Sequence, residues 1–394
     1  MSARRTLRRA AGGAALLLAI ALVAELALRL AYLGASPALL GPWRRPAPWR
    51  QIRTLDASGA PWPRPRGEAR WALHPWAAPV DYRLDERGLR VGADAEAVAP
   101  RDGCRVLVAG DSNAFGYGVA AADAYPTRLA AELARRDITA RVDNAGVCGS
   151  NVRVQRAWLE RLLPGSGADV VVLTVSPWSL RVDHAPPPRD ATFADKLWNA
   201  IALRAGAASS VSSIADRGHR LLAHALHGVL GWPPDQAVAW ELEPLLEPRA
   251  DFSRRLEEAK AEIGGIARLA RESGAALVLV FVPLDVQVSR ARNRLYLEER
   301  LPYQALGFDD RDYTVDDRYR GVADLAGAVS APLVDVTADL RAIARDAYLA
   351  DDYHLSPAGN ARVAAAVAPA VAHACGEAVQ RGRSGELVAR RGSE

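Results

Sequence analysis

Short apolar runs alternate with longer amphipathic stretches between residues 105 and 373, and this alternation constrains the fold more than any other feature of the sequence. The run ADVVVLTV (168–175) is continuously apolar and β-branched, which is typical of a strand covered on both faces. Strands that alternate with helices form parallel βαβ units. The sequence therefore predicts an α/β fold, a three-layer α/β/α sandwich built around a parallel sheet.

The same pattern sets the limits of this domain, which we expect to span residues 103–375. A Pro- and Ser-rich insertion at 183–250 interrupts the alternation and is either a lid or a packing insertion. The polar residues 376–394 are predicted to form a disordered tail. The expected strands are 105–110, 140–146, 168–175, 275–283 and 332–336, and the expected helices are 125–135, 152–163, 253–273, 319–329 and 357–373.

Residues 1–42 are predicted to be a membrane anchor that uses the lipid bilayer as its partner. Clustered arginines precede an apolar stretch from Ala10 to Leu33, which is long enough to cross about 30 Å of hydrocarbon as one transmembrane helix. The alternative is a signal peptide cleaved near Gly34–Ala35, but the stretch exceeds the usual apolar length of such peptides. We expect a single-pass protein of the cell membrane with an extracytoplasmic domain, although further arginines after the span nearly cancel the charge bias that sets orientation.

Residues 43–102 are rich in Pro, Trp and Arg and are predicted to form a semi-extended stalk. Proline at this density prevents long helices and removes backbone donors. So many tryptophans are expected to pack against the domain rather than remain in water. Within this stretch, YRLDERGLR (82–90) has the pattern of a short strand and a turn.

Composition excludes several classes of function. The 50 basic residues nearly balance the 46 acidic ones and form no dense basic tract inside the domain, so we expect no nucleic-acid partner. The odd number of widely spaced cysteines, Cys104, Cys148 and Cys375, predicts no disulfide framework, and Cys148 is interpreted as a buried structural thiol.

We also expect no cofactor and no metal. The chain has no phosphate-binding loop, dinucleotide fingerprint or zinc motif. His219, His224 and His227 lie close together, but no carboxylate or cysteine cluster accompanies them, so a partly exposed helix face is the better interpretation.

Ser112 is the first candidate for chemistry. The predicted strand RVLVAG (105–110) runs directly into Asp111 and Ser112, which places the serine at the carboxyl end of a parallel strand, where open α/β sheets bind their ligands. A serine there can also be a simple helix cap. Asp111 is interpreted as a structural hydrogen-bonding residue of the turn.

A second motif near the end of the domain favours catalysis. Asp351 and His354 are separated by two residues just before the last helix, so the carboxylate can meet one imidazole nitrogen while the other accepts the serine proton. Ser356 and Pro357 follow as a hydroxyl cap and a proline at the first helical position. Together with Ser112, this pattern predicts a Ser-His-Asp triad.

These residues make the chain resemble the SGNH (GDSL-like) hydrolase family, from about residue 103 to residue 373. Gly110-Asp111-Ser112 resembles the first block of the family, Gly146 the glycine whose N–H serves the oxyanion hole, and Asp351 with His354 the final D-x-x-H block. The resemblance implies a flavodoxin-like fold, Ser112 as nucleophile, and the backbone N–H groups of Ser112 and Gly146 as oxyanion donors.

The third block, G-x-N-D, is absent. Ser176-Pro177-Trp178-Ser179 stands in its place, so the asparagine that donates to the oxyanion is missing. Loss of one such donor typically costs about 3–4 kcal/mol of transition-state stabilisation. The side chains considered as substitutes are Asn113, Asn151, Ser176 and Ser179.

The sequence thus predicts a serine esterase acting on an acyl ester of a carbohydrate or lipid in the envelope or outside the cell. One alternative is an O-acyltransferase to an envelope polysaccharide, which would share the acyl-enzyme. The other is a non-catalytic SGNH-like binding or scaffold protein, favoured by the missing asparagine and opposed by the intact triad.

Overall fold

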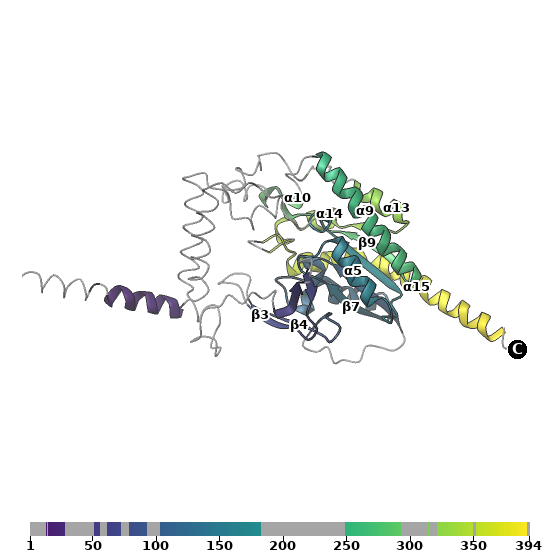
Figure 1. Cartoon of the computed structure of the whole chain (residues 1–394), viewed down its shortest axis with the longest axis horizontal. Coiled ribbons are helices and arrows are strands. Elements are labelled where there is room, and N and C mark those ends of the chain that lie inside the picture. Colours follow the sequence, from purple (N-terminus) through teal and green to yellow (C-terminus); the bar gives the residue numbers. More distant parts are fainter. Residues whose placement is uncertain are drawn as a thin grey trace, which may run out of the picture. The chain divides into compact units, whose positions relative to one another are not determined.

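A computed structural model describes residues 13, 15–27, 51–55, 61–71, 79–92, 103–182, 249–292, 314, 321–349 and 352–391 (Figure 1). The chain divides into two compact units, and the sheet belongs to the unit formed by residues 49–69, 81–186 and 236–394. The predicted insertion at 183–250 lies outside the described residues except for its last two positions.

The centre of the sheet is parallel, as the sequence predicts. Its strands run in the order β10-β9-β8-β6-β7. They are β6 (Cys104–Gly110), β7 (Ala140–Gly146), β8 (Val170–Val175), β9 (Ala276–Phe281) and β10 (Leu333–Asp335). After β6 the chain adds β7 on one side and all later strands on the other, so β6 and β8 flank the topological switch point, where α/β sheets bind ligands.

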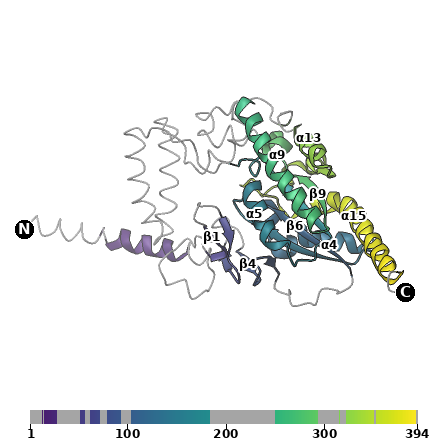
Figure 2. The same cartoon turned by 45° about the vertical axis from the view of Figure 1, so that its right-hand side comes forward.

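Helices cover both faces of this sheet and form two separate cores. Alternate residues of β6 point to opposite faces of the sheet. Leu107 and Ala109 pack in one core, and Val106 and Val108 pack in the other. The first core lies under α5 (Val152–Leu162), α9 (Arg249–Glu272) and α13 (Gly321–Val329), and the second under α4 (Tyr125–Ala134) and α15 (Pro357–Arg391). Figure 2 shows α5 and α9 side by side, and the three-layer α/β/α arrangement is confirmed.

Part of the predicted stalk at 43–102 is instead a part of the domain. Strands β3 (Glu68–Trp71), β4 (Val80–Leu84) and β5 (Arg90–Val91) extend the sheet beyond β7, and β5 pairs with β7 in antiparallel direction. The sheet is therefore mixed rather than wholly parallel. The physical reason is apolar burial, since Tyr82 and Leu89 are almost completely inaccessible to solvent. The strand and turn predicted at 82–90 are confirmed.

A small hairpin adds to this extension. Strand β1 (Arg53–Leu55) pairs with β2 (Pro61–Pro63), and Trp62 of β2 packs edge-on against Trp158 of α5 with ring centroids 5.2 Å apart. Ile52, just before β1, is buried. The expectation that tryptophans of this stretch pack against the domain is confirmed for Trp62.

The apolar N-terminal stretch is described only at residues 13 and 15–27, which are helical. Leucine, isoleucine and valine side chains there are solvent-exposed, Leu17 by 69% and Val23 by 68%. Within the described ranges, no helix has both the length and the apolar character needed to cross a membrane. The predicted span from Ala10 to Leu33 extends past these residues on both sides, so the anchor stays a prediction.

The chain after Cys375 is helical, and not the disordered tail predicted for 376–394. Helix α15 continues to Arg391. Arg, Ala and Glu make up half of residues 376–391, and these residue types favour helix enough to continue one that packing has already started.

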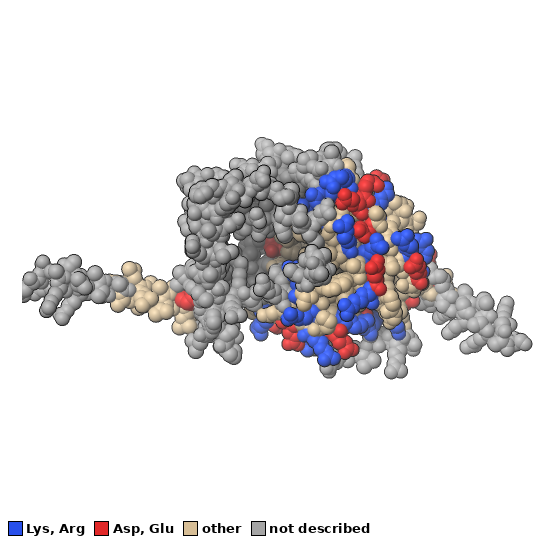
Figure 3. Space-filling view, in the orientation of Figure 1, with Lys and Arg blue, Asp and Glu red and all other residues tan. Residues whose placement is uncertain are grey.

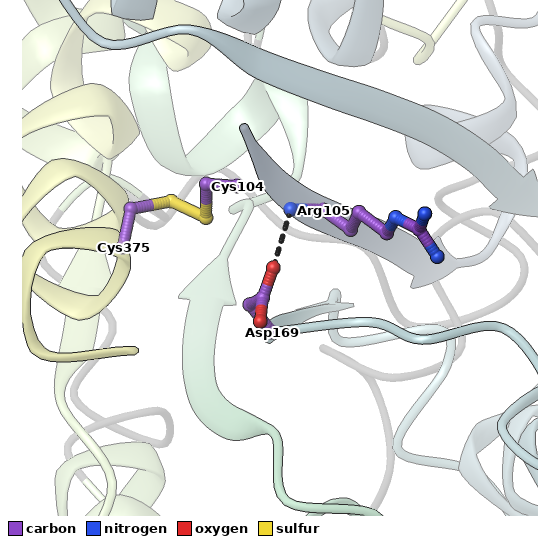
Figure 4. The surroundings of a disulfide bond; sticks show 4 residues. All are labelled: Cys104, Arg105, Asp169 and Cys375. Atoms are coloured by element: carbon purple, nitrogen blue, oxygen red, sulfur yellow. Dashed lines mark hydrogen bonds between the residues drawn. A yellow bond between two sulfur atoms is a disulfide. The ribbon is translucent and has the colours of Figure 1, made fainter. Parts of the chain in front are cut away.

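Cys104 and Cys375 form a disulfide that the sequence did not predict (Figure 4). The fold brings the first residue of β6 beside the middle of α15, with the two Cα atoms 5.6 Å apart, although 271 positions separate them in the chain. Next to it, the backbone N–H of Arg105 donates to Asp169 at 2.8 Å. Cys148 is free and buried, as expected, and burial raises the pKa of its thiol far above the usual range.

Charges are mixed on the face that carries α5 and α9 (Figure 3). Arg153 and Arg156 of α5 both pair with Glu262 of α9, at 3.0 and 3.2 Å. On this face, the described residues therefore show alternating signs and no broad basic surface of the kind that binds nucleic acid.

The disulfide generates the first prediction. Because the bond closes a very long loop, Cys104→Ser should lower the free energy of unfolding by about 2–5 kcal/mol. Thermal melting of the wild type with and without reductant should show the same loss, and reductant should leave the variant unchanged. Alkylation of denatured, unreduced protein should label Cys148 alone, and labelling of all three cysteines would contradict the bond.

Candidate active site

The turn between β6 and α3 (Ser112–Phe115) fixes the position of Ser112. Asp111 caps the helix, because its carboxylate accepts the backbone N–H of Asn113 at 2.8 Å. Below the helix, a Cβ atom at Gly146 would lie 2.3 Å from the backbone nitrogen of Phe115, so only glycine permits this approach. Ser112 therefore stands at the switch point of the sheet with its side chain partly exposed.

The structure brings Ser112 and His354 together. Nε2 of His354 lies 2.7 Å from Oγ of Ser112. On the other side of the ring, Nδ1 of His354 forms a short hydrogen bond with Oδ1 of Asp352. His354 is 4% exposed, so the imidazole is held in this orientation away from bulk water. Nucleophile, base and orienting carboxylate form the continuous relay that nucleophilic catalysis requires.

Among the described residues, the carboxylate that meets the ring of His354 belongs to Asp352, the neighbour of the predicted Asp351. Asp351 itself lies outside the described residues. Oδ1 of Asp352 also accepts the backbone N–H of His354 at 2.8 Å, which is the local turn that aspartate favours with the residue two positions on. Since this turn folds the Asp352 carboxylate back onto His354, the same oxygen reaches the ring. The contact that the structure describes therefore has the spacing D-x-H.

Residues at the start of α15 hold the loop that carries His354. Ser356 caps the helix as predicted, its Oγ accepting the N–H of Gly359 at 3.0 Å. The side chain of Asn360 links this loop to α4: it donates to the carbonyl of Leu355 at 3.1 Å and accepts the N–H of Tyr125 at 2.9 Å. The base is thereby connected to the helical layer below the sheet.

Buried arginines fix two loops of the site by donating to main-chain carbonyls. Arg90 of β5 donates to Phe115 at 2.6 Å, to Val119 at 2.6 Å and to Gly116, which closes the carboxyl end of the nucleophile's helix. Burial lowers the pKa of its guanidinium to about 10. Sequence reasoning missed this role, for which the pattern YRLDERGLR was the only signal.

Arg292 acts in the same way on the loop of the base. Its guanidinium donates to the carbonyls of Tyr348 and Leu349 at 3.1 and 2.5 Å. Tyr348 in turn donates its hydroxyl to Pro283 at 2.6 Å and pairs with Leu355 in an isolated bridge. The chain on both sides of His354 is therefore anchored.

Two aromatic rings contact the imidazole. The centroid of the Tyr117 ring lies 4.2 Å from that of His354, and the centroid of the Tyr353 ring lies 4.3 Å from it. Both tyrosines are partly exposed. These rings restrict rotation of the imidazole and leave aromatic surface beside the nucleophile.

Asp111 is structural, in agreement with the sequence analysis. It is buried, it caps α3, and its second oxygen accepts the hydroxyl of Ser176. Burial raises the pKa of its carboxyl despite these hydrogen bonds. Ser176 and Ser179 also bond to each other, N–H to Oγ, at 2.7 and 3.2 Å. Residues 176–179, which replace the third block, thus help to hold Asp111 in place through the hydrogen bond from Ser176.

All four side chains considered as substitute oxyanion donors are already engaged in hydrogen bonds. Ser176 and Ser179 are buried in the network just described, and the amide of Asn151 donates to Arg181 at 2.8 Å and caps α5. Asn113 accepts the N–H of Leu355 at 3.4 Å, and its side chain also hydrogen-bonds to the carboxylate of Asp111. None of these four side chains is therefore left unengaged as a substitute for the family's asparagine.

The predicted oxyanion role of Gly146 does not agree with its hydrogen bonding. Its N–H donates to the side chain of Asn144 at 3.0 Å, and the residue serves instead to admit α3. Gly149 is the better candidate: it is partly exposed, has φ of +75°, and its N–H has no hydrogen-bond partner in the described part of the chain. Its loop is tied to the end of β6, since Val147 donates to the carbonyl of Gly110 at 2.9 Å.

Metal ligation has no support in the described ranges, which contain no group of three or more His, Cys, Asp or Glu side chains able to hold an ion. His219, His224 and His227 fall outside those ranges.

Comparison with known proteins gives one family match. Residues 241–392 match the family profile described as "ALGX: SGNH hydrolase-like domain, acetyltransferase AlgX". The matched residues contain Asp352 and His354 but not Ser112. No curated protein sequence matches the chain.

Several solved structures are similar at low identity. TesA is 16% identical with a TM-score of 0.37, over 68% of this chain and 97% of TesA. The acetyl xylan esterase AlAXEase is 15% identical with a TM-score of 0.36, over 68% and 99% of the two chains. A catalytic mutant of Axe2, an acetylxylan esterase from Geobacillus stearothermophilus, is 14% identical with a TM-score of 0.36, over 70% and 96%.

The choice between the two adjacent carboxylates can be tested directly. Asp352→Asn should lower kcat for a simple acyl ester by roughly 10³- to 10⁴-fold, because the amide no longer holds the imidazole in the correct tautomer. Asp351→Asn is the matched control and should change kcat by less than about tenfold. The opposite ranking of the two variants would restore the D-x-x-H assignment.

Proposed function

Because this chain carries an SGNH hydrolase-like domain, we propose that it is a serine esterase that works through an acyl-enzyme. The observation that carries the proposal is the relay in which His354 Nε2 lies 2.7 Å from Ser112 Oγ while Asp352 bonds to Nδ1. A hydroxyl within hydrogen-bond reach of a base that is itself oriented by a carboxylate is an activated nucleophile.

The geometry assigns each step of the reaction. Ser112 Oγ attacks the carbonyl carbon of the ester while its proton passes to His354 Nε2. His354 then returns the proton to the leaving alcohol oxygen as the ester bond breaks, which leaves an acyl group on Ser112. Water attacks this acyl-enzyme, gives its proton to Nε2, and the acid is released as Ser112 regains its proton. Asp352 stays ionised and stabilises the imidazolium in both halves.

The negative charge that develops on the carbonyl oxygen needs donors near Ser112. The backbone N–H groups of Ser112 and Gly149 are proposed for this role. Each donor is worth roughly 10²- to 10³-fold in kcat when it is aimed at the oxyanion.

Two features support a location outside the cytoplasm. The Cys104–Cys375 disulfide is of a kind that persists in oxidising compartments and is rare in the cytosol. The exposed apolar side chains of residues 15–27 suit a lipid anchor, because such a surface is unfavourable in water. We therefore propose a membrane-tethered enzyme that acts on an acyl ester of an envelope carbohydrate or lipid.

Transfer of the acyl group to a carbohydrate hydroxyl is the second candidate, favoured by the acetyltransferase description of the matching family. Hydrolysis and transfer share the acyl-enzyme and differ only in whether water or a sugar hydroxyl attacks it. A non-catalytic binding role is disfavoured, because a binding protein gains nothing from a buried imidazole aligned between a serine and a carboxylate.

Covalent labelling tests the nucleophile. A fluorophosphonate probe should label the wild type at Ser112, and Ser112→Ala should abolish both labelling and ester turnover. His354→Ala added to Ser112→Ala should cost little more, because the members of a triad act as a unit.

Analysis of the products distinguishes hydrolysis from acyl transfer. With an acetyl ester and an added oligosaccharide, hydrolysis gives free acetate, whereas transfer gives an acetylated sugar. If wild type and Ser112→Ala were indistinguishable in labelling, hydrolysis and transfer, the enzyme proposal would be wrong.

Fractionation tests the anchor. The full chain should remain in the membrane fraction after a high-salt wash, because apolar insertion is insensitive to ionic strength, and externally added protease should digest its domain. A version that lacks residues 1–42 should be released. Recovery of the full-length gene product as a soluble species that begins near residue 36 would show that the segment is cleaved.

A further inference from the structure

The peptide group between Cys148 and Gly149 is fixed by a hydrogen bond to its carbonyl oxygen. Nη1 of Arg53, in strand β1, donates to the carbonyl oxygen of Cys148 at 2.7 Å. Arg53 is partly buried, and desolvation lowers the pKa of its guanidinium. A residue from the segment expected to be a stalk therefore contacts the loop that follows β7.

The geometry of this contact directs the N–H of Gly149 away from Arg53. The described residues contain no cis peptide bond, and in a trans peptide the C=O and N–H point in opposite directions. A Cβ atom at Gly149 would lie 2.7 Å from Nη1 of Arg53, and the φ of +75° is itself unfavourable for other residues. Position 149 thus requires glycine both for its backbone conformation and for the approach of the guanidinium.

A cation hydrogen-bonded to the carbonyl oxygen increases the donor strength of the N–H in the same peptide. Hydrogen bonds in series polarise one another, so a charged donor on the C=O makes the N–H of the same amide a stronger donor. The contact also fixes the plane of the peptide before substrate arrives, which is the condition for stabilising a developing charge without reorganisation. Within the described residues, the N–H of Gly149 makes no hydrogen bond, so it can donate to a substrate oxygen.

We propose that Arg53 is a positioning residue of the oxyanion site, which orients and polarises the Cys148–Gly149 peptide toward the substrate's carbonyl oxygen. The inference rests on the proposed acyl chemistry of Ser112. It goes further by assigning a role in that chemistry to a side chain outside the relay and outside the α/β core.

The test uses Arg53→Met in the full chain, a variant that keeps the aliphatic stem but removes the charge and the donors. For an acetyl ester, kcat should fall about 10- to 100-fold, less than for complete loss of a donor. KM should stay within about twofold, because a neutral ground-state carbonyl gains little from the stronger donor. Affinity for an alkyl boronic acid, whose anionic adduct with Ser112 resembles the tetrahedral intermediate, should fall by a similar factor.

Arg64→Met is the matched control, since Arg64 lies just after β2 with an exposed side chain. It should match the wild type in kcat, KM and boronate affinity. Thermal melting identifies a variant that does not fold, and Arg53→Lys, which retains a charge and a donor, should then show the intermediate kcat.

Three outcomes would count against the proposal. Wild-type kcat and boronate affinity in folded Arg53→Met would overturn it while leaving the esterase proposal intact. Equal losses in Arg53→Met and Arg64→Met would overturn it as well, because they would indicate a general effect of charge. Absence of Ser112-dependent turnover and of a boronate adduct in the wild type would overturn both proposals.

Discussion

Helix α3 lies so close to the sheet that no side chain fits beneath it. A Cβ atom at Gly110 would be 2.7 Å from the Cβ atoms of Ala114 and Thr174, and one at Gly146 would be 2.3 Å from the nitrogen of Phe115. These two glycines end the neighbouring strands β6 and β7 at the same edge. The rest of the site depends on this close approach, because it sets how far Ser112 lies above the sheet. The loop that carries His354 has to reach that position.

Arginine–carbonyl hydrogen bonds then fix the loops around that serine. Arg53 holds the loop after β7, Arg90 the loop after α3, and Arg292 the loop before His354. A guanidinium presents several donors in a rigid plane and stays charged when partly desolvated, so one side chain can order several orphan carbonyls at once. Hydrogen bonds from three separate segments to main-chain carbonyls therefore hold the loops that surround the relay.

Periodicity in the sequence was sufficient to predict the strands and helices of the α/β layers, because burial on one or both faces leaves a pattern in the residues themselves. Sequence alone does not decide the finer assignments where nearby residues of the same type compete for one role. Whether Asp351 or Asp352 meets His354 depends on the backbone angles of one turn, and whether Gly146 or Gly149 offers a free N–H depends on the side chain of Asn144. The disulfide was missed because sequence separation does not reveal that two Cα atoms lie 5.6 Å apart.

The antiparallel pairing of β5 with β7 limits how far the chain can be truncated from its N-terminus. A chain that began at residue 103 would keep all three members of the relay, yet β7 would become an unprotected edge strand, open to pairing with other chains. The carbonyls of Phe115, Gly116 and Val119 would lose the guanidinium that satisfies them. A self-sufficient unit therefore has to include β5 with Arg90, and a fragment without them would be aggregation-prone however complete its catalytic residues.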